Sequence, residues 1–491
     1  MVAALWLLAP TSMYADGGKR EFRGAWMQFV NGMYLGKSTA EIQQMLTHQL
    51  DELEKDGANA IIFQVRGECD ALYESKIEPW SRYLTGVQGK APSPYWDPMA
   101  WMIQQCHRRG MEFHAWINPY RARMKSPTRL ADNHILKTHP ERAFEYGGLY
   151  VLNPGLKENR DYILSVVDDI VSRYDIDGIH IDDYFYPYPE GGRPIPDDRE
   201  YALYNNGIAD RGDWRRYNVN LFVKEMGEHV HKLKPWVKFG VSPFGIYRNK
   251  KSSPIGSDTN GLQNYDQLYA DVLLWVNNGW IDYCVPQLYW HIGHPLADYE
   301  KLIKWWAKHM ANRPLYIGES IENTVQNSDP ANPNTHQMAA KFRLHRQLRN
   351  VSGTVLWYAK VAAEDMGSYG TMLRNVYWKS KALPPYMPFL DSKAPKKPAK
   401  VGDAWTEDGL MLYWSAPKAK KWGDEARRYV IYRFAKGEKV NLADASKIVE
   451  ITYDTYYRLP YDGGTKKYKY VVTALDRVGN ESKGAKRKVK L

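Results

Sequence analysis

The stretch Asp177-Gly178-Ile179-His180-Ile181-Asp182-Asp183-Tyr184 predicts the architecture of the whole chain. It is a short apolar run that ends in two adjacent carboxylates. It is the fourth of eight apolar or aromatic runs, each after the first preceded by a helical pattern. Because parallel strands need a covering helix at each crossover, eight such units predict a (β/α)8 TIM barrel. Enzymes with this fold carry their chemistry at the carboxyl ends of the strands, where Asp182 and Asp183 fall.

The strand candidates are short and are separated by helical patterns, the first of which begins with a Ser38–Glu41 capping box. An open doubly wound sheet shows the same alternation, but a glycine-rich phosphate loop typically follows its first strand. Here that strand runs into Gln28-Phe29-Val30-Asn31, so we expect a closed barrel. The predicted strands are Phe22–Gln28, Ala60–Arg66, Glu112–Asn118, Gly178–Asp183, Lys238–Pro243, Asp282–Tyr289, Leu315–Glu319 and Thr354–Tyr358.

The length of 491 residues predicts two domains, because a single core rarely grows beyond about 250–300 residues. We expect the α/β barrel over residues 20–391 and a linker rich in proline and lysine over residues 392–400. A small all-β domain is expected over residues 401–491, where strand-like runs recur at β-sandwich spacing. These runs are Met411–Trp414, Tyr429–Arg433, Ile448–Thr452 and Tyr468–Leu475.

Most of the positive charge belongs to the last hundred residues. The chain has a formal net charge of +11, and residues 394–491 hold 22 Lys and Arg against 12 Asp and Glu, a difference of +10. This predicts docking on an anionic surface such as a cell wall; the alternative is a solubilising surface with a basic tail, Lys483–Lys490. No base-reading motif is present, so no nucleic-acid partner is expected.

The first fifteen residues resemble a truncated signal peptide. An apolar stretch, Val2–Ala9, is followed by Ser12-Met13-Tyr14-Ala15, a small-residue cleavage pattern. We therefore expect residues 1–15 to direct export to the periplasm or the cell surface. The stretch is too short to span a bilayer, and we expect no transmembrane segment. Three scattered cysteines and unclustered histidines predict neither a disulfide framework nor a metal site, and no cofactor is expected.

Strand alternation places His180 and Asp182 on one face of the fourth strand, toward the barrel mouth. Glycoside hydrolysis usually needs one ionised and one protonated carboxyl group. Asp182 fits the ionised role, with His180 beside it. The predicted proton donor is Glu319 at the end of the seventh strand, with Asp183, Glu68 and Asp70 as alternatives.

Side chains suited to sugar recognition gather at the predicted strand ends. Amides and arginine match hydroxyl and N-acetyl groups, and aromatic rings offer faces for stacking. Each of these side chains alone could be a packed core residue, so the signal is their coincidence. The candidate binding residues are Gln64, Arg66, Asp70, Trp116, Asn118, Tyr120, His180, Tyr184, Gln287, Tyr289, Trp290 and Trp357.

Several motifs together resemble the glycosyl hydrolase-like 10 family over about Glu21 to Trp378. This resemblance implies a TIM-barrel hydrolase of exported bacterial glycans, with peptidoglycan strands as the substrate class. The motifs are Glu21-Phe22-Arg23-Gly24-Ala25-Trp26, Ile62-Phe63-Gln64-Val65-Arg66, Asp70-Ala71-Leu72-Tyr73, Glu78-Pro79-Trp80-Ser81, His114-Ala115-Trp116-Ile117-Asn118-Pro119-Tyr120-Arg121 and Gly178-Ile179-His180-Ile181-Asp182-Asp183-Tyr184-Phe185-Tyr186-Pro187.

Two more resemblances concern parts of the chain. The fourth strand is similar to a motif of the α-amylase superfamily, which implies that Asp182 is the nucleophile. However, His180 replaces the arginine of that motif, and no acid ends the fifth strand. The segment Val471–Ser482, with Leu412–Pro417, resembles a fibronectin type III module.

Two other functions stay open. One is an α-glucan hydrolase, or another polysaccharide hydrolase, for nutrient use; the other is a barrel that binds glycan without cleaving it. No Gly-x-Ser-x-Gly elbow, phosphate loop or Cys–His signature points to a different chemistry.

Overall fold

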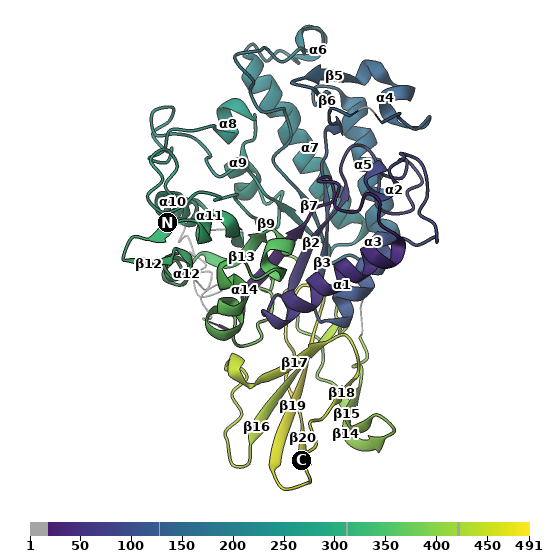
Figure 1. Cartoon of the computed structure of the whole chain (residues 1–491), viewed down its shortest axis with the longest axis vertical. Helices are drawn as coiled ribbons and strands as arrows, with labels where there is room; N and C mark the ends of the chain where they lie inside the picture. Colours follow the sequence, from purple (N-terminus) through teal and green to yellow (C-terminus); the bar gives the residue numbers. More distant parts are fainter. Residues whose placement is uncertain (1–17, 127, 311–312, 420–422) are drawn as a thin grey trace, which may run out of the picture.

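The computed structural model describes residues 18–126, 128–310, 313–419 and 423–491, so the expected signal peptide lies outside the described residues. Eight parallel strands close into a barrel, and each coincides with or overlaps a predicted strand, which confirms the (β/α)8 fold (Figure 1). In barrel order the strands are β1 (Phe22–Met27), β2 (Ala60–Arg66), β3 (Glu112–Ile117), β7 (Gly178–Ile181), β8 (Lys238–Val241), β9 (Tyr283–Cys284), β10 (Leu315–Ser320) and β13 (Val351–Trp357).

Strand β9 is much shorter than the predicted Asp282–Tyr289. Pro286 has no backbone N–H to continue the ladder, so regular pairing stops before it. Gln287 nevertheless forms isolated bridges with Phe244 and Gly318, which hold this segment in the barrel wall. The segment after β9 therefore still places its side chains at the mouth of the barrel.

Helices cover the outside of the strands (Figure 1). The expected capping box is present: the Ser38 side chain accepts from the Glu41 amide while Glu41 bonds back to Ser38. The α-helices are α1 (Thr39–Lys55), α2 (Arg82–Thr85), α3 (Pro98–Arg108), α4 (Ile135–Thr138), α5 (Lys157–Arg173), α6 (Asp198–Tyr204), α7 (Arg211–Leu233), α8 (Asn264–Gln267), α9 (Val272–Asn277), α10 (Tyr299–His309), α11 (Ile321–Val325), α12 (Met338–Gln347), α13 (Ala359–Ala363) and α14 (Tyr369–Met372).

Two small sheets stand in the connections between barrel strands and were not predicted. One is β4 (Arg121–Arg123), β6 (Leu149–Leu152) and β5 (Ala143–Tyr146); the other is β11 (Ser328–Asp329) with β12 (Asn332–His336). In Figure 1, β5, β6, α4 and α6 lie at one end of the barrel, and the C-terminal β region lies at the other.

A column of buried polar side chains runs along the inside of the barrel. His114 Nε2 lies 3.1 Å from a carboxylate oxygen of Glu112, and His114 Nδ1 lies 2.7 Å from the Tyr283 hydroxyl. The same hydroxyl is 3.1 Å from His180 Nδ1, and His180 Nε2 is 2.9 Å from the Ser242 hydroxyl. The column thus joins the first residue of β3 to the segment that follows β8.

The C-terminal region is all β, as predicted. One sheet has the order β14-β15-β18 and the other β17-β16-β19-β20. The expected basic tail, Lys483–Lys490, is mostly strand: β20 pairs antiparallel with β19, and Val489 is buried between the sheets. The strands are β14 (Ala399–Thr406), β15 (Gly409–Ser415), β16 (Arg428–Ala435), β17 (Ile448–Thr452), β18 (Tyr456–Arg458), β19 (Lys467–Leu475) and β20 (Ala485–Lys490).

The β region packs on the amino-terminal end of the barrel, which we call the floor. Arg428 at the start of β16 is buried, and its guanidinium lies 2.7 Å from Glu112, the first residue of β3. Lys238, the first residue of β8, donates to both oxygens of the same carboxylate at 2.6 Å. A charge removed from water needs such partners, so the β region completes the ion network of the floor.

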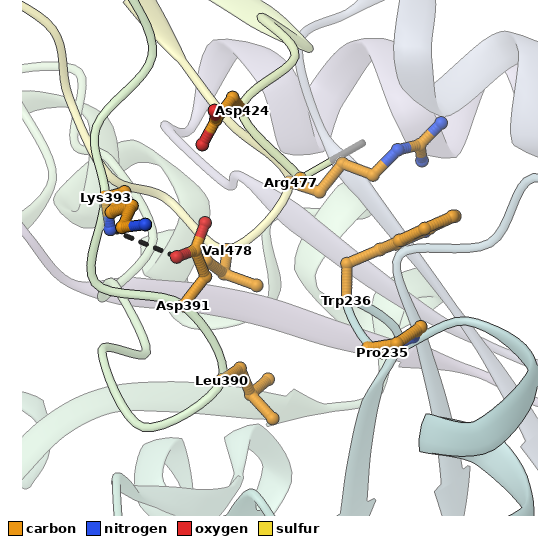
Figure 2. A pocket seen from close by; sticks show the side chains of 9 residues that line it. Pro235, Trp236, Leu390, Asp391, Lys393, Asp424, Arg477 and Val478 are labelled. Atoms are coloured by element: carbon orange, nitrogen blue, oxygen red, sulfur yellow. Dashed lines mark hydrogen bonds between the residues drawn. The ribbon is translucent and has the colours of Figure 1, made fainter. Parts of the chain in front are cut away.

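A cavity of about 210 Å³ lies between the floor and the β region (Figure 2). Trp236, just before β8, forms one side, and the Arg477 guanidinium lies 4.9 Å from the centre of its ring. Asp391 accepts from the backbone N–H of Lys393 at 3.1 Å. This cavity is therefore at the end of the barrel opposite the carboxyl ends of the strands.

Candidate active site

A cavity of about 270 Å³ opens at the carboxyl ends of the barrel strands. Both carboxylates of the fourth strand motif line it, although Asp182 is only 4% exposed and Asp183 only 1%. Within the described part of the chain, these two are the only acidic residues in its wall. The other lining residues are Trp26, Trp116, Tyr184, Tyr188, Ser242, Phe244, Gln287, Tyr289, Trp290 and Trp357.

Asp182 has one anchored oxygen and one free oxygen. Its Oδ2 accepts hydrogen bonds from Trp116 Nε1, at 3.2 Å, and from Asn118 Nδ2. Its Oδ1 is buried without a hydrogen-bond partner among the described residues. Burial, and then the neighbouring charge of Asp183, raise the pKa of Asp182 to about 7. A carboxyl group that lines the cavity and titrates near neutral pH suits proton exchange with a bound substrate.

Asp183 is held by both of its oxygens. Tyr188 donates its hydroxyl hydrogen to Oδ2, and Gln287 Nε2 donates to Oδ1 at 3.0 Å. Burial raises the pKa of Asp183, and the hydrogen bonds from Tyr188 and Gln287 oppose that rise. Because Gln287 also donates to the Ser242 carbonyl oxygen at 2.9 Å, its amide is fixed in the orientation that faces Asp183.

A buried amide network positions Asp182. The Asn118 side-chain oxygen accepts from Gln64 Nε2 at 2.6 Å and from Arg121 Nη2 at 2.5 Å. With its oxygen so occupied, the amide must present its NH2 group to Asp182. The Arg121 guanidinium also donates to the Gly67 carbonyl at 2.9 Å, which anchors the network to the loop after β2.

Aromatic rings make the apolar wall of the cavity. The Tyr289 and Trp357 rings stack with centroids 5.9 Å apart, and Trp26 meets their edges at 6.4 and 6.1 Å. Flat rings beside a pair of carboxyl groups offer a sugar ring an apolar surface to rest on. The site therefore combines the two elements that glycoside hydrolysis requires: carboxyl groups and a carbohydrate-compatible wall.

Comparison with known families agrees with this geometry. The family model described as glycosyl hydrolase-like 10 matches residues 21–334, which include both carboxylates and most of the barrel. The chain belongs to the glycosyl hydrolase-like 10 family. The resemblance predicted from the motifs is thus confirmed, and the protein is a glycoside hydrolase.

Relatives of this family member include two glycosyl hydrolases. The chain is 39% identical over 482 residues to glycosyl hydrolase YngK of Bacillus subtilis (strain 168), covering 96% of this chain and 94% of that one. It is 37% identical over 332 residues to glycosyl hydrolase DigH of Escherichia coli (strain K12), covering 64% of this chain and 75% of that one.

Solved structures give more distant similarities. One is α-L-fucosidase isoenzyme 2 from Paenibacillus thiaminolyticus, with TM-score 0.47, 11% identity, and coverage of 72% of this chain and 49% of that chain. Another is the catalytic domain of β-amylase from Paenibacillus polymyxa, with TM-score 0.46, 12% identity, and coverage of 74% and 99%.

The structure does not bring Glu319 to the cavity. Tyr316 belongs to the core inside the barrel and Ile317 to the helix-facing core, so alternation turns Glu319 toward the helices. There its carboxylate lies 2.6 Å from Lys341 Nζ and accepts from Thr324, all three side chains being buried. The prediction that Glu319 is the proton donor is therefore corrected: Glu319 is half of a buried ion pair behind the barrel wall.

His180 points into the barrel as predicted, but one layer below the cavity. Two residues of a strand span about 7 Å, so the side chain of His180 lies deeper than that of Asp182. Both of its ring nitrogens are engaged in the buried column, and burial lowers its pKa well below the ordinary value. His180 thus contacts Tyr283 and Ser242, and the predicted role in binding a sugar hydroxyl is corrected.

Four other predicted binding residues lie behind the cavity wall. Arg66 pairs with Glu78 at 2.7 Å, and both side chains are fully buried. Asp70 accepts from Gln88 Nε2 at 3.2 Å. Tyr120 packs edge-on against Phe222, and Gln64 supports Asn118. The predicted residues that do line the cavity are Trp116, Tyr184, Gln287, Tyr289, Trp290 and Trp357, while Asn118 touches Asp182 from behind.

Sequence reasoning missed some lining residues. Tyr188 and Phe244 lie in the segments after β7 and β8, and their rings meet edge-on with centroids 5.9 Å apart. Trp26 is the last residue but one of β1 and lies within a family motif, so its position could have marked it as a binding residue. Ser242 directly follows β8, but serine at a strand end is too common to signal a role.

In the described part of the chain, no helix is long and apolar enough to cross a membrane. Likewise, no group of three or more His, Cys, Asp or Glu side chains in that part is arranged to hold a metal ion.

Proposed function

We propose that the protein hydrolyses glycosidic bonds in the glycan strands of bacterial peptidoglycan, with Asp182 as the group that delivers the proton to the leaving oxygen. The observation that carries this proposal is a cavity lined by two carboxyl groups, one of which, Asp182, has an oxygen, Oδ1, without a hydrogen-bond partner among the described residues. With a pKa of about 7, about half of the Asp182 carboxyl groups carry a proton at neutral pH, so the group can act as a general acid there. This role replaces the ionised one expected from the sequence.

Asp183 would then carry the negative charge of the pair. Its two oxygens are held by Tyr188 and Gln287, so it cannot rotate away when charge develops on the sugar ring. An oriented carboxylate stabilises an oxocarbenium-like transition state better than water does, because it needs no reorganisation during the reaction. The two adjacent carboxyl groups can take different roles, proton donor and negatively charged carboxylate, because their surroundings differ.

The substrate class rests on chemistry and on the expected export. Peptidoglycan glycan carries N-acetyl groups and apolar ring faces. The oxygen of the Gln287 amide can accept from an N-acetyl N–H, and the aromatic wall of Tyr289 and Trp357 can meet the ring faces. Residues 1–15 predict export to the compartment where this polymer is found. The relatives are named glycosyl hydrolases, in agreement with the reaction class.

The test is incubation of the full chain with peptide-free glycan strands, intact sacculi and starch, followed by mass spectrometry of the released fragments. Products from glycan strands are expected. Products from starch alone would identify an α-glucan hydrolase, and binding without products from any of the three would contradict the proposed hydrolysis of peptidoglycan glycan.

Asp182→Asn should lower the rate on glycan at least a thousandfold while leaving binding measurable. The matched control is Asp476→Asn in the β region, a buried carboxyl whose pKa burial likewise raises, to about 6, but which lies outside the cavity. This control should keep wild-type activity. A comparable loss in both variants, or none in Asp182→Asn, would contradict the proposed role.

A further inference from the structure

Strand β19 begins and strand β20 ends at the end of the β region farthest from the barrel, near the C terminus (Figure 1). A groove lined by lysines lies there. Its volume is about 560 Å³. In the described part of the chain, none of its lysines forms an ion pair with a carboxylate; the nearby Glu438 pairs with Lys447 at 2.5 Å. The five lysines are Lys436, Lys467, Lys469, Lys488 and Lys490.

The strand register places these charges directly opposite one another. Lys467 pairs with Lys490, and Lys469 with Lys488, so four ammonium groups stand on one patch of the sheet. Directly opposed side chains lie about 5 Å apart at Cβ, and like charges in such pairs are destabilising. The fold therefore concentrates positive charge here at a cost in stability, which an anionic ligand would offset.

Protection of a sheet edge does not account for the cluster. Lysines on an edge strand discourage pairing with another chain, and β20 is the edge strand of its sheet. However, Lys467 and Lys469 belong to β19, which lies between β16 and β20, and Lys436 follows β16. Lysines on an interior strand that lie opposite lysines on the edge strand are expected of a binding surface. They are not needed to protect the sheet edge from pairing with another chain.

We infer that this groove binds a linear, base-free phosphodiester polymer. Lysines two residues apart repeat about every 7 Å along each strand, which presents a regular row of point charges to a repeating anion. Stacking of nucleic-acid bases needs a free aromatic face. Tyr468, the aromatic residue of the groove wall, instead packs against the core between the sheets, and the Arg433 guanidinium lies 5.1 Å from the centre of its ring.

The position of the groove suits a tether. The active-site cavity lies at the carboxyl ends of the barrel strands, and the β region packs on the opposite end of the barrel. A polymer held in the groove therefore leaves the cavity open to a glycan chain. This inference is independent of the proposed hydrolysis, because it rests on a separate surface and is tested by binding alone.

The probe is synthetic poly(glycerol phosphate). Its binding constant for the full chain is measured by titration calorimetry at salt concentrations from 25 to 200 mM. Replacing Lys467, Lys469, Lys488 and Lys490 by glutamine should weaken binding at least tenfold and lower the slope of log K against log salt by roughly 3. The charge-matched control replaces the exposed Lys37, Lys90, Lys396 and Lys397 by glutamine and should bind within about twofold of wild type.

The melting temperature of the groove variant should equal or exceed that of wild type, because like-charge pairs are removed. Equal weakening in both variants would show that only net charge matters, which overturns the inference. So would wild-type binding to single-stranded oligo-dT, or to vesicles of phosphatidylglycerol, at least as tight as binding to poly(glycerol phosphate).

Discussion

Replacing Arg428 by methionine tests whether the β region is part of the barrel core. Arg428 is 2% exposed, and its guanidinium donates to Glu112 at 2.7 Å and lies 5.8 Å from the centre of the Tyr453 ring. Methionine keeps the length of the side chain but loses a charged hydrogen bond, worth about 1.5–3 kcal/mol, and a cation–π contact of up to about 1 kcal/mol. Because Lys238 still neutralises Glu112, we expect a loss of about 3 kcal/mol.

Replacing the anion of this network, Glu112, should lower the free energy of unfolding by more than replacing Arg428. Glu112→Gln leaves Arg428 and Lys238 as two buried cations without their shared partner, for which about 3–5 kcal/mol is expected. In the double variant Glu112→Gln/Arg428→Met, part of that repulsion is gone. Its loss should therefore be smaller than the sum of the single losses, by about 0.5–3 kcal/mol.

The pH dependence gives a second measure of the same network. Although burial alone would raise the pKa of Glu112, Lys238 and then Arg428 lower it from 4.5 to about 2. A lowered folded-state pKa contributes stability above the unfolded pKa, here about 3 kcal/mol, and that contribution is lost as the pH falls from about 4.5 to 2. The stability of Glu112→Gln should therefore depend less on pH in that window.

The assay is urea unfolding at pH 7, followed by tryptophan fluorescence and by far-UV circular dichroism, because two domains need two probes. Arg428→Met should separate the two transitions. The control is Arg487→Met, which removes a half-exposed ion pair to Asp403 and should change stability by less than about 1 kcal/mol. If Arg428→Met unfolds like Arg487→Met, with one coincident transition, the floor network does not hold the domains together.

Two predictions concern the carboxyl groups of the barrel. On glycan, kcat/KM should fall as the pH rises through about 7, because Asp182 loses its proton there. Asp183→Asn removes a neighbouring negative charge, so in this variant kcat/KM should begin to fall at lower pH. A pH–rate profile in which the fall stays at the same pH would contradict this. Glu319→Gln should lower the unfolding free energy by about 3 kcal/mol, because it breaks the ion pair with Lys341. At temperatures where the variant is folded, its kcat/KM should stay within about threefold of the wild-type value. A hundredfold loss of kcat/KM would instead show that Glu319 takes part in catalysis.

The barrel could be predicted because its strands are buried on both faces and read as continuous apolar runs. The inserted sheet β4-β6-β5 was missed, although Gly147-Gly148 between β5 and β6 is a two-residue hairpin signal. The strand β20 was also missed, because its lysines dominate the composition. Its period-2 pattern, with Val489 buried between exposed lysines, was the signal that composition concealed.

The candidate site could be predicted only where the sequence shows which side chains of a strand point into the barrel and which point toward the helices. Along β7 and the residue after it, the polar residues His180 and Asp182 alternate with Ile179 and Ile181, so the sequence sets which side faces inward. On β10 Tyr316 and Ile317 are both apolar, and alternation alone cannot say which of them points into the barrel. The choice of Glu319 failed for this reason. Gly318 is the inward position, since a Cβ there would lie 3.1 Å from the Trp26 ring.

Net charge alone could not separate two different uses of the basic residues in the β region. Arg427 and Arg477 pair with Asp175 beside the floor, and Arg428 ends the polar column inside the barrel, so these three serve the barrel's own fold. The lysines of β19 and β20 face no carboxylate in the described part of the chain. Deleting residues 394–491 would remove both sets together and would leave Glu112 and Lys238 exposed at an open floor. If such a truncated chain failed to bind, either a damaged barrel or the missing groove could be the cause. Substituting the groove lysines alone leaves the floor intact, so a loss of binding in that variant can be assigned to the groove.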